Sequence, residues 1–316
     1  VEKVTIIFDA VTFRTTRSEG DDEHKQRADA LTIATLDDLA NQCYTSSESG
    51  ERGPHTRNQK IFQVRGVYEV VIGLLDWEVS EFTEHEAGGS VVVEGVADLK
   101  VEEACCKFLI AFMFQNAENK QMLFAKAHFM DLVNLSGKVT MVAQVLVATV
   151  KNDFRLCTMV SKRMLTQYAL GIADNVPDES VLDFFKAILC AKDEVVEKNR
   201  ELVLHTFLEH QRLLDPFIPA YMEDLWGGGE IGEEALKYEQ YQIGALDILT
   251  EVMHGSPLSR IEGQLIVSLD RIKRLCAIAS NEFLKLRAAL IRYMTVVYLT
   301  SRHDKPWALM STLENC

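Results

Sequence analysis

Apolar residues recur at helical spacing along most of the chain. Between Asn58 and Asp76 they keep one stripe over about five turns, while Lys60, Arg65 and Glu69 fall outside that stripe. This pattern predicts an amphipathic helix that packs on its neighbours. The residues of the stripe are Ile61, Val64, Val67, Tyr68, Val71, Leu74 and Leu75.

One plan repeats along the sequence: an apolar helix, a short polar break, and a second helix that opens on an amide or an acid. The clearest copy runs from Cys105 to Leu132, a second from Val181 to Leu208, and a looser third from Ile243 to Ile272. Asn119 and Asn199 occupy equivalent places 80 residues apart, about two helix hairpins of roughly 40 residues each. The spacing predicts an all-α fold, an armadillo/HEAT-like α-solenoid of stacked helix hairpins.

The repeats favour a single solenoid domain over residues 1–316, because each hairpin buries its apolar stripe on the next one. Residues 15–57 are polar, and we expect them to be partly flexible around a short amphipathic piece. Residues 215–233 carry two prolines and three consecutive glycines, which predicts an internal loop. Glycines also interrupt the helical pattern at residues 85–95. The apolar positions of the short amphipathic piece are Ile33, Leu36, Leu39 and Cys43.

Three helices are predicted in the last third of the chain, at residues 234–254, 265–279 and 282–299. In the last of them, Lys285 and Arg292 point away from the apolar side. That side is formed by Phe283, Leu286, Leu290, Tyr293 and Val297.

Composition narrows the classes of function. The chain has 33 basic and 47 acidic residues, a formal net charge of −14, which repels phosphate backbones and anionic headgroups. No apolar run reaches the ~20 residues that span a bilayer. We therefore expect a soluble segment that binds no nucleic acid and does not insert into a membrane. The start at Val1, without a secretory leader, suggests a piece of a longer protein.

The seven cysteines are odd in number and lack C-x-x-C spacing, which is typical of the reducing cytosol. Cys105, Cys106, Cys157, Cys190 and Cys276 lie in apolar helical runs, so we interpret them as buried thiols. A run of bulky side chains is interpreted as core and not as the lining of a ligand site, because stacked hairpins need such contacts. This run comprises Phe112, Met113, Phe114, Met122 and Phe124.

Residues 227–232 spell the letters of a dinucleotide-binding motif, G-x-G-x-x-G. That motif needs a preceding strand and a following helix N-terminus that is free of anions. Glu230, Glu233 and Glu234 stand where the helix would begin, so the glycines indicate a flexible loop.

His205, Glu209 and His210 resemble an inverted zinc-protease helix, but their spacing places the two histidines about 140° apart on a helix. No second ligand shares a face with His205 and Glu209. His210 instead falls on the apolar stripe of Val203, Phe207 and Leu214, where a packed histidine is the usual outcome.

Two further motifs are incomplete. Ser136–Thr140 resembles a phosphate loop, but Leu132 replaces its first glycine and Val139 its magnesium-binding hydroxyl residue. The acidic run Glu19–Glu23 lacks the ordered alternation of ligands and the terminal glutamate of a calcium-binding EF-hand loop, so it is expected at most to attract cations weakly and without a defined site. We therefore predict no catalytic residue, no cofactor and no metal, and the sequence identifies no ligand-binding residue.

Residues 105–124, 180–208 and 269–313 resemble the helical homology domain of inositol trisphosphate receptors and ryanodine receptors, most closely its second copy in the receptor chain. The resemblance extends over about two thirds of the chain. It implies a non-catalytic cytosolic regulatory segment of a tetrameric intracellular calcium-release channel, on the endoplasmic reticulum membrane, which relays ligand-induced motion toward the pore. The implied partners are neighbouring domains of the same chain, adjacent subunits and regulatory proteins.

The chain departs from this family at one functional position. In the family's first copy, the break before the residue equivalent to Asn119 helps to hold the inositol phosphate through lysine, arginine and tyrosine. Here the break reads Gln115, Asn116, Ala117 and Glu118, with no basic neighbour, so we assign no ligand site to it. The alternative function is an armadillo/HEAT-type protein-binding scaffold unrelated to channels.

Overall fold

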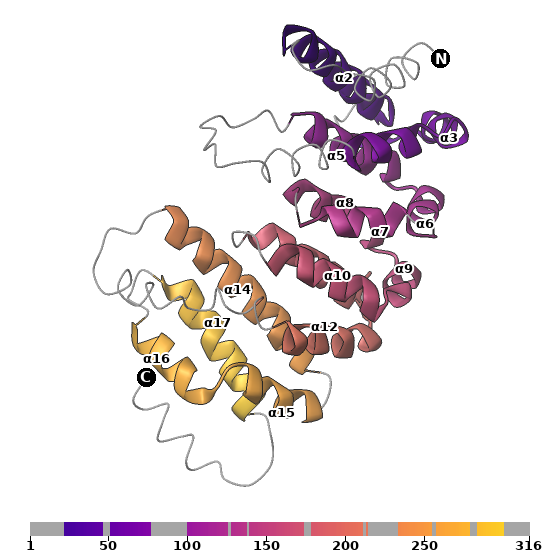
Figure 1. Cartoon of the computed structure of the whole chain (residues 1–316). Helices are drawn as coiled ribbons and strands as arrows, with labels where there is room; N and C mark the ends of the chain where they lie inside the picture. The colour runs from indigo at the N-terminus through magenta and orange to yellow at the C-terminus, as the bar shows by residue number, and fades with distance from the viewer. Residues whose placement is uncertain are drawn as a thin grey trace. The chain divides into compact units, whose positions relative to one another are not determined.

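The computed structural model divides the chain into two compact units, Val1–Val150 and Lys151–Cys316, which are considered in turn (Figure 1). The structure describes residues 22–46, 51–76, 100–125, 128–137, 139–173, 178–210, 213, 233–254, 257–278 and 283–299. Almost all of this part of the chain is helical, which confirms the all-α class. None of the described helices is long and apolar enough to cross a membrane.

The first unit is a stack of helices in which α5 occupies the centre. It packs against α2, α3 and α8, and α6 and α7 also pack on α8. Within this unit each helix therefore buries its apolar side on others of the stack, as the repeat predicted. The elements are α2 (Asp22–Gln42), β1 (Tyr44–Ser46), β2 (Arg52–Pro54), α3 (Thr56–Val64), a helix at residues 67–76, α5 (Lys100–Met113), α6 (Ala117–Ala125), α7 (His128–Leu135) and α8 (Thr140–Val150).

Aromatic rings join the helices of the first unit. The rings of Tyr68 and Phe112 stack with centroids 5.5 Å apart, and Phe108 lies 6.0 Å from Phe112 and 5.9 Å from Phe62. Such pairs add roughly 0.5–1.5 kcal/mol each to the burial of their surface. Phe112 and Met113 are fully buried, which confirms them as core.

The long amphipathic helix predicted for residues 58–76 is wrong in one respect, because the structure breaks it. α3 ends at Val64, and Gly66 has a φ of +68°, in the left-handed region that glycine adopts without strain. Gly66 therefore starts a turn, and the second helix leaves in a new direction.

The break changes which side chains are buried. Ile61 and Val64 are 46% and 74% exposed, although the sequence pattern placed both in the core. Phe62 and Gln59 are buried in their place. A stripe that is continuous in the sequence is therefore not continuous in space, since the turn at Gly66 gives each half its own buried face.

A short antiparallel hairpin, β1–β2, connects α2 to α3, with Tyr44 opposite Pro54. It lies in the segment where the sequence indicated only an amphipathic piece between loops. That piece lies in α2, and Leu36 and Leu39, with Cys43 just after the helix, are buried as the spacing predicted.

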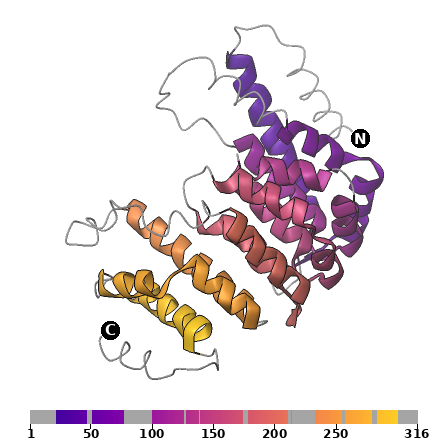
Figure 2. The same cartoon turned by 60° about the horizontal axis from the view of Figure 1, so that its bottom comes forward.

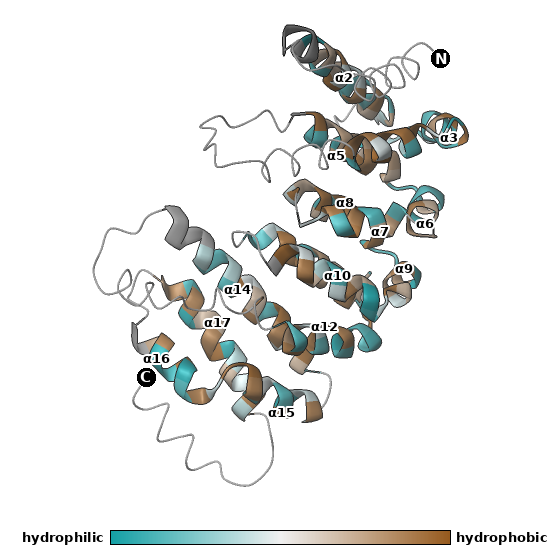
Figure 3. Ribbon diagram, viewed as in Figure 1, coloured by the Kyte–Doolittle hydropathy of each residue, from teal (hydrophilic) through white to brown (hydrophobic). Residues whose placement is uncertain are grey.

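The second unit is also a stack of helices, with α14 packed between α12 and α17 (Figure 2). Colouring by hydropathy shows apolar residues along these helices interleaved with polar ones (Figure 3). The elements are α9 (Phe154–Met159), α10 (Lys162–Ala173), η1 (Glu179–Leu182), α11 (Asp183–Leu189), β3 (Cys190–Ala191), β4 (Glu194–Val195), α12 (Glu197–Glu209), α14 (Glu233–Met253), α15 (Pro257–Ile266), α16 (Leu269–Ile278), α17 (Leu284–Met294) and η4 (Thr295–Leu299).

Local chemistry explains several helix boundaries in this unit. The side chain of Asp153 accepts a hydrogen bond from the Leu156 amide at 3.1 Å, and Asp178 accepts one from the Ser180 amide at 2.8 Å. Each acid satisfies a backbone donor that a helix N-terminus leaves free. Lys192 has a positive φ, as does the residue after it, and the two form the tight turn between β3 and β4.

The last third differs from the prediction in one helix. The predicted helix over 265–279 is divided between α15 and α16 by residues 267–268, and α15 was missed. Tyr293, on α17, holds α15 in place, because its hydroxyl donates a hydrogen bond to the Gly263 carbonyl of α15 at 2.7 Å. The apolar side predicted for the helix at 282–299 is confirmed across α17 and η4, because all five of its residues are buried: Phe283, Leu286, Leu290, Tyr293 and Val297.

Several predicted segments lie outside the described residues. These are the glycine-interrupted stretch 85–95, residues 215–232 of the predicted internal loop, and the motif-like glycines at 227–232 within it.

Candidate functional site

The functional candidates are buried side-chain amides at the junctions between helices. Asn119 is the third residue of α6 and is 1% exposed. Its Nδ2 donates to the Phe112 carbonyl, near the end of α5, at 2.8 Å. The last carbonyls of a helix lack intrahelical partners, so this bond satisfies one of them and fixes α6 to α5.

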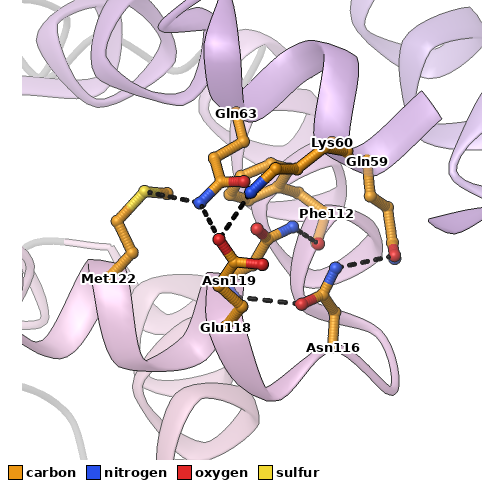
Figure 4. A network of polar contacts seen from close by, with 8 residues as sticks. All are labelled: Gln59, Lys60, Gln63, Phe112, Asn116, Glu118, Asn119 and Met122. Carbon is orange, nitrogen blue, oxygen red and sulfur yellow. Dashed lines mark hydrogen bonds and ion pairs between the residues drawn. The ribbon is translucent and has the colours of Figure 1, made fainter. Parts of the chain in front are cut away.

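Gln59 ties a third helix into the same junction (Figure 4). From α3, its Nε2 donates to the carbonyls of Ala111 at 3.1 Å and Phe114 at 3.0 Å. Asn116 completes the connection, because its Nδ2 donates to Gln59 Oε1 at 3.1 Å and its Oδ1 accepts from the Asn119 amide at 3.1 Å. The end of α5 is thus held by amides from both neighbouring helices.

Asn199 plays the equivalent part in the second unit. It is the third residue of α12 and is fully buried. Its Nδ2 donates to the carbonyls of Ile188, at the end of α11, and Cys157, in α9, both at 2.8 Å. The equivalence of Asn119 and Asn199, predicted from their spacing, is therefore confirmed by a shared position and a shared bond.

A third such contact was missed by the sequence analysis. Asn58, the third residue of α3, donates through Nδ2 to the carbonyl of Gln42, the last residue of α2, at 2.9 Å. The sequence carried a sign of it, an asparagine near the start of the second helix after a polar break. We call the contacts of Asn58, Asn119 and Asn199 the amide clamps.

The amide clamp at Asn119 is bordered by an ion pair that the sequence did not reveal. Lys60 Nζ lies 2.5 Å from Glu118 Oε1, and Gln63 Nε2 donates to the same oxygen at 3.1 Å (Figure 4). Both charged side chains are more than half exposed, so the pair adds little stability. The hydrogen bond from Lys60, followed by that from Gln63, lowers the pKa of Glu118 below its usual range.

This ion pair corrects the statement that the break at 115–118 has no basic neighbour. The neighbour is absent along the sequence but present in space, because α3 carries Lys60 to Glu118. The two charges offset one another, so the break itself still presents no net positive charge to a polyphosphate.

The cysteines that were predicted to be buried are buried except for Cys190, which is exposed in β3, and the buried thiols are poor nucleophiles. Burial raises the pKa of the Cys43 thiol to about 12 and, with smaller contributions from Glu102 and Glu103, that of Cys106 to about 12. A thiol in this range is protonated at neutral pH and unreactive.

The residues that resembled a zinc site are separated by the end of α12. Glu209 is its last residue and is paired with Lys162, with Nζ 2.5 Å from Oε1. His210 is the C-cap, with a non-helical φ of −117° and ψ of 69°. Across the residues that the structure describes, no group of three His, Cys, Asp or Glu side chains is placed to hold a metal ion.

The remaining motif residues have local roles or lie outside the description. Ser136 is buried, and its hydroxyl donates to the Val133 carbonyl at 2.7 Å, within the turn that ends α7. Of the acidic run, Asp22 and Glu23 begin α2, whereas residues 19–21 lie outside the described part. Among the described residues, the buried amides join neighbouring helices through hydrogen bonds.

Comparison with known proteins identifies the family. The family model of the RIH domain, of ryanodine and inositol trisphosphate receptors, matches residues 37–217, more than half of the chain. None of the curated proteins compared gives a significant match. RIH domains are non-catalytic and are found in calcium-release channels. The matched region contains all three amide clamps, and the chain belongs to the RIH-domain family of ryanodine and inositol trisphosphate receptors.

Proposed function

We propose that this chain is a non-catalytic regulatory segment of a tetrameric intracellular calcium-release channel. It lies on the cytosolic face of the endoplasmic reticulum membrane and relays ligand-induced motion toward the pore. Its partners are the neighbouring domains of the same chain, adjacent subunits and regulatory proteins. Among the copies of the domain in such a receptor, the pattern of helices favours the second. The observation that carries the proposal is the RIH match over residues 37–217.

The amide clamps give the relay a physical basis inside each unit. Asn199 bonds the carbonyls of Ile188 and Cys157 at once, so a displacement of α12 is passed to both α9 and α11. Helix contacts fixed at their ends transmit small rotations with little loss, because packed interiors deform poorly. We propose that one solenoid extends over residues 1–316 and carries these movements along the chain. Family membership argues against a scaffold unrelated to channels.

The relay is tested in the full-length channel. Asn199→Ala should reduce ligand-evoked calcium flux through reconstituted channels while the dissociation constant for the activating ligand stays unchanged. Ile188→Val is the control for stability, because it trims a buried side chain next to the clamp and keeps every hydrogen bond. Equal flux in the Asn199→Ala and Ile188→Val channels would refute the relay.

In the same proposal, this segment transmits motion and does not itself bind inositol trisphosphate. The net charge of −14 disfavours a polyphosphate, and the pairing of Lys60 with Glu118 leaves the break at 115–118 without the charge-assisted contacts that it would need there, each worth about 1.5–3 kcal/mol. Calorimetry of the chain with inositol trisphosphate at low salt should therefore give no measurable heat of binding, although screening is then weakest. Micromolar or tighter binding would overturn this assignment.

A further inference from the structure

The segment from Arg52 to Tyr68 has a charge opposite to that of the chain. It carries four Lys or Arg residues and no Asp or Glu, in a protein with a net charge of −14. A local excess of this kind on an acidic protein attracts acidic partners that the rest of the surface repels. The segment includes all of α3.

Two of the four cations are engaged within the protein. Arg52 lies over the ring of Tyr44, 5.2 Å from its centroid, and Lys60 pairs with Glu118. Arg57 and Arg65 are exposed, and neither forms an ion pair with a described residue. They are the charges that α3 presents outward.

The exposed face of α3 is also apolar at its centre. Ile61 and Val64, 46% and 74% exposed, lie between Arg57 and Arg65 on one side of the helix. The opposite side carries Phe62, which is buried against α5.

From this pattern we propose that the outer face of α3 docks an acidic segment of another protein that presents apolar side chains between its carboxylates. Arg57 and Arg65 are two helical turns apart, about 12 Å along the axis, with two apolar side chains between them. This spacing suits two separate carboxylates better than one compact phosphate, and an amphipathic segment pairs a carboxylate with each arginine and buries its apolar residues on Ile61 and Val64. The inference does not depend on the proposed relay.

Nearby acids leave this face open to an acidic partner. Glu118, on α6, is held by Lys60 and Gln63. Glu69 accepts a hydrogen bond from the Tyr68 hydroxyl at 2.7 Å, beyond the turn at Gly66. Both carboxylates therefore have hydrogen-bond partners other than Arg57 and Arg65.

Binding of a synthetic peptide tests the proposal. The probe is a short fluorescein-labelled helical peptide with glutamates two turns apart on either side of a leucine pair, and its partner peptide has serines for the leucines. Fluorescence anisotropy with the intact chain at low salt should show saturable binding of the leucine peptide and roughly tenfold weaker binding of the serine peptide. Equal binding of the two peptides would mean that the face attracts them by charge alone, and would overturn the inference.

Variants locate the binding to α3. Two double variants should each weaken binding of the leucine peptide by tenfold or more: Arg57→Glu with Arg65→Glu, and Ile61→Ser with Val64→Ser. The matched controls are Arg163→Glu and Leu258→Ser, an exposed arginine on α10 and an exposed leucine on α15, which should change nothing. All four positions, three on α3 and Arg65 at its C-cap, are exposed, so the variants should fold, which a circular dichroism melt checks. Unchanged binding in either α3 variant, or displacement of the peptide by pyrophosphate at equal concentration, would refute protein docking.

Discussion

The amide clamps allow a quantitative comparison inside one chain, because Asn199→Ala and Asn119→Ala remove the same group from the same helix position. Each asparagine is buried, and each has an Oδ1 without a hydrogen bond within the described structure. Loss of that oxygen, and of the side-chain volume, is therefore common to both substitutions and cancels in the difference between them.

The two substitutions differ in the number of hydrogen bonds lost. Asn119→Ala removes one, to the Phe112 carbonyl, and leaves a buried acceptor at a cost of about 1–3 kcal/mol. Asn199→Ala removes two, to Ile188 and Cys157, but the Cys157 carbonyl still accepts from the Val160 amide at 3.2 Å. The second loss should therefore add only the net worth of one bond, about 0.5–1.5 kcal/mol.

Hydrogen exchange followed by mass spectrometry is the appropriate assay, because a chain of two units need not unfold in one step. Local unfolding free energies are read from peptides of α6 for Asn119→Ala and of α12 for Asn199→Ala. Asn134→Ala, at an exposed position of α7, should stay within about 0.5 kcal/mol of the parent chain. A smaller loss for Asn199→Ala than for Asn119→Ala, or losses no larger than the control, would refute the clamp.

Two other predictions follow from the first unit. Gly66→Ala should destabilise it by about 1–2 kcal/mol in urea unfolding, because the φ of +68° is unfavourable for alanine and the new Cβ would lie 3.2 Å from Glu69 Oε2. Gly73→Ala, at an exposed helical position where a new Cβ would have no neighbour within 4 Å, should instead stabilise the unit by about 0.4–1 kcal/mol. If both substitutions changed the unfolding free energy in the same direction, the left-handed turn at Gly66 would be contradicted. Lys60→Met should raise the pKa of Glu118 toward its usual value in a carboxyl NMR titration. Since the folded-state pKa is lowered, the stabilising effect of the pair is present above the unfolded pKa and is lost as the pH falls through the folded value; an unchanged Glu118 titration would exclude the pair in solution.

Features that depend on residues close in sequence were predictable. Five of the buried residues between Phe283 and Val297 were identified correctly, because helical period by itself decides which residues share a face. The equivalence of Asn119 and Asn199 was also readable, since each follows a polar break at the start of a second helix. The helix starts after Asp153 and Asp178 likewise rest on short-range contacts, each a hydrogen bond that extends over only two or three residues.

Features that depend on residues far apart in sequence were decided by the tertiary structure. Lys60 and Glu118 are 58 positions apart, and Gln59 reaches Ala111 across 52, so no local pattern could show that they meet. The exposure of Val64 has the same origin. The apolar pattern before Gly66 fits a helix equally well whether Val64 is buried or exposed. Only the turn at Gly66 and the packing of Phe62 against α5 decide which side of α3 faces the core. Period determines which residues share a face, whereas the direction of that face depends on the neighbouring helices.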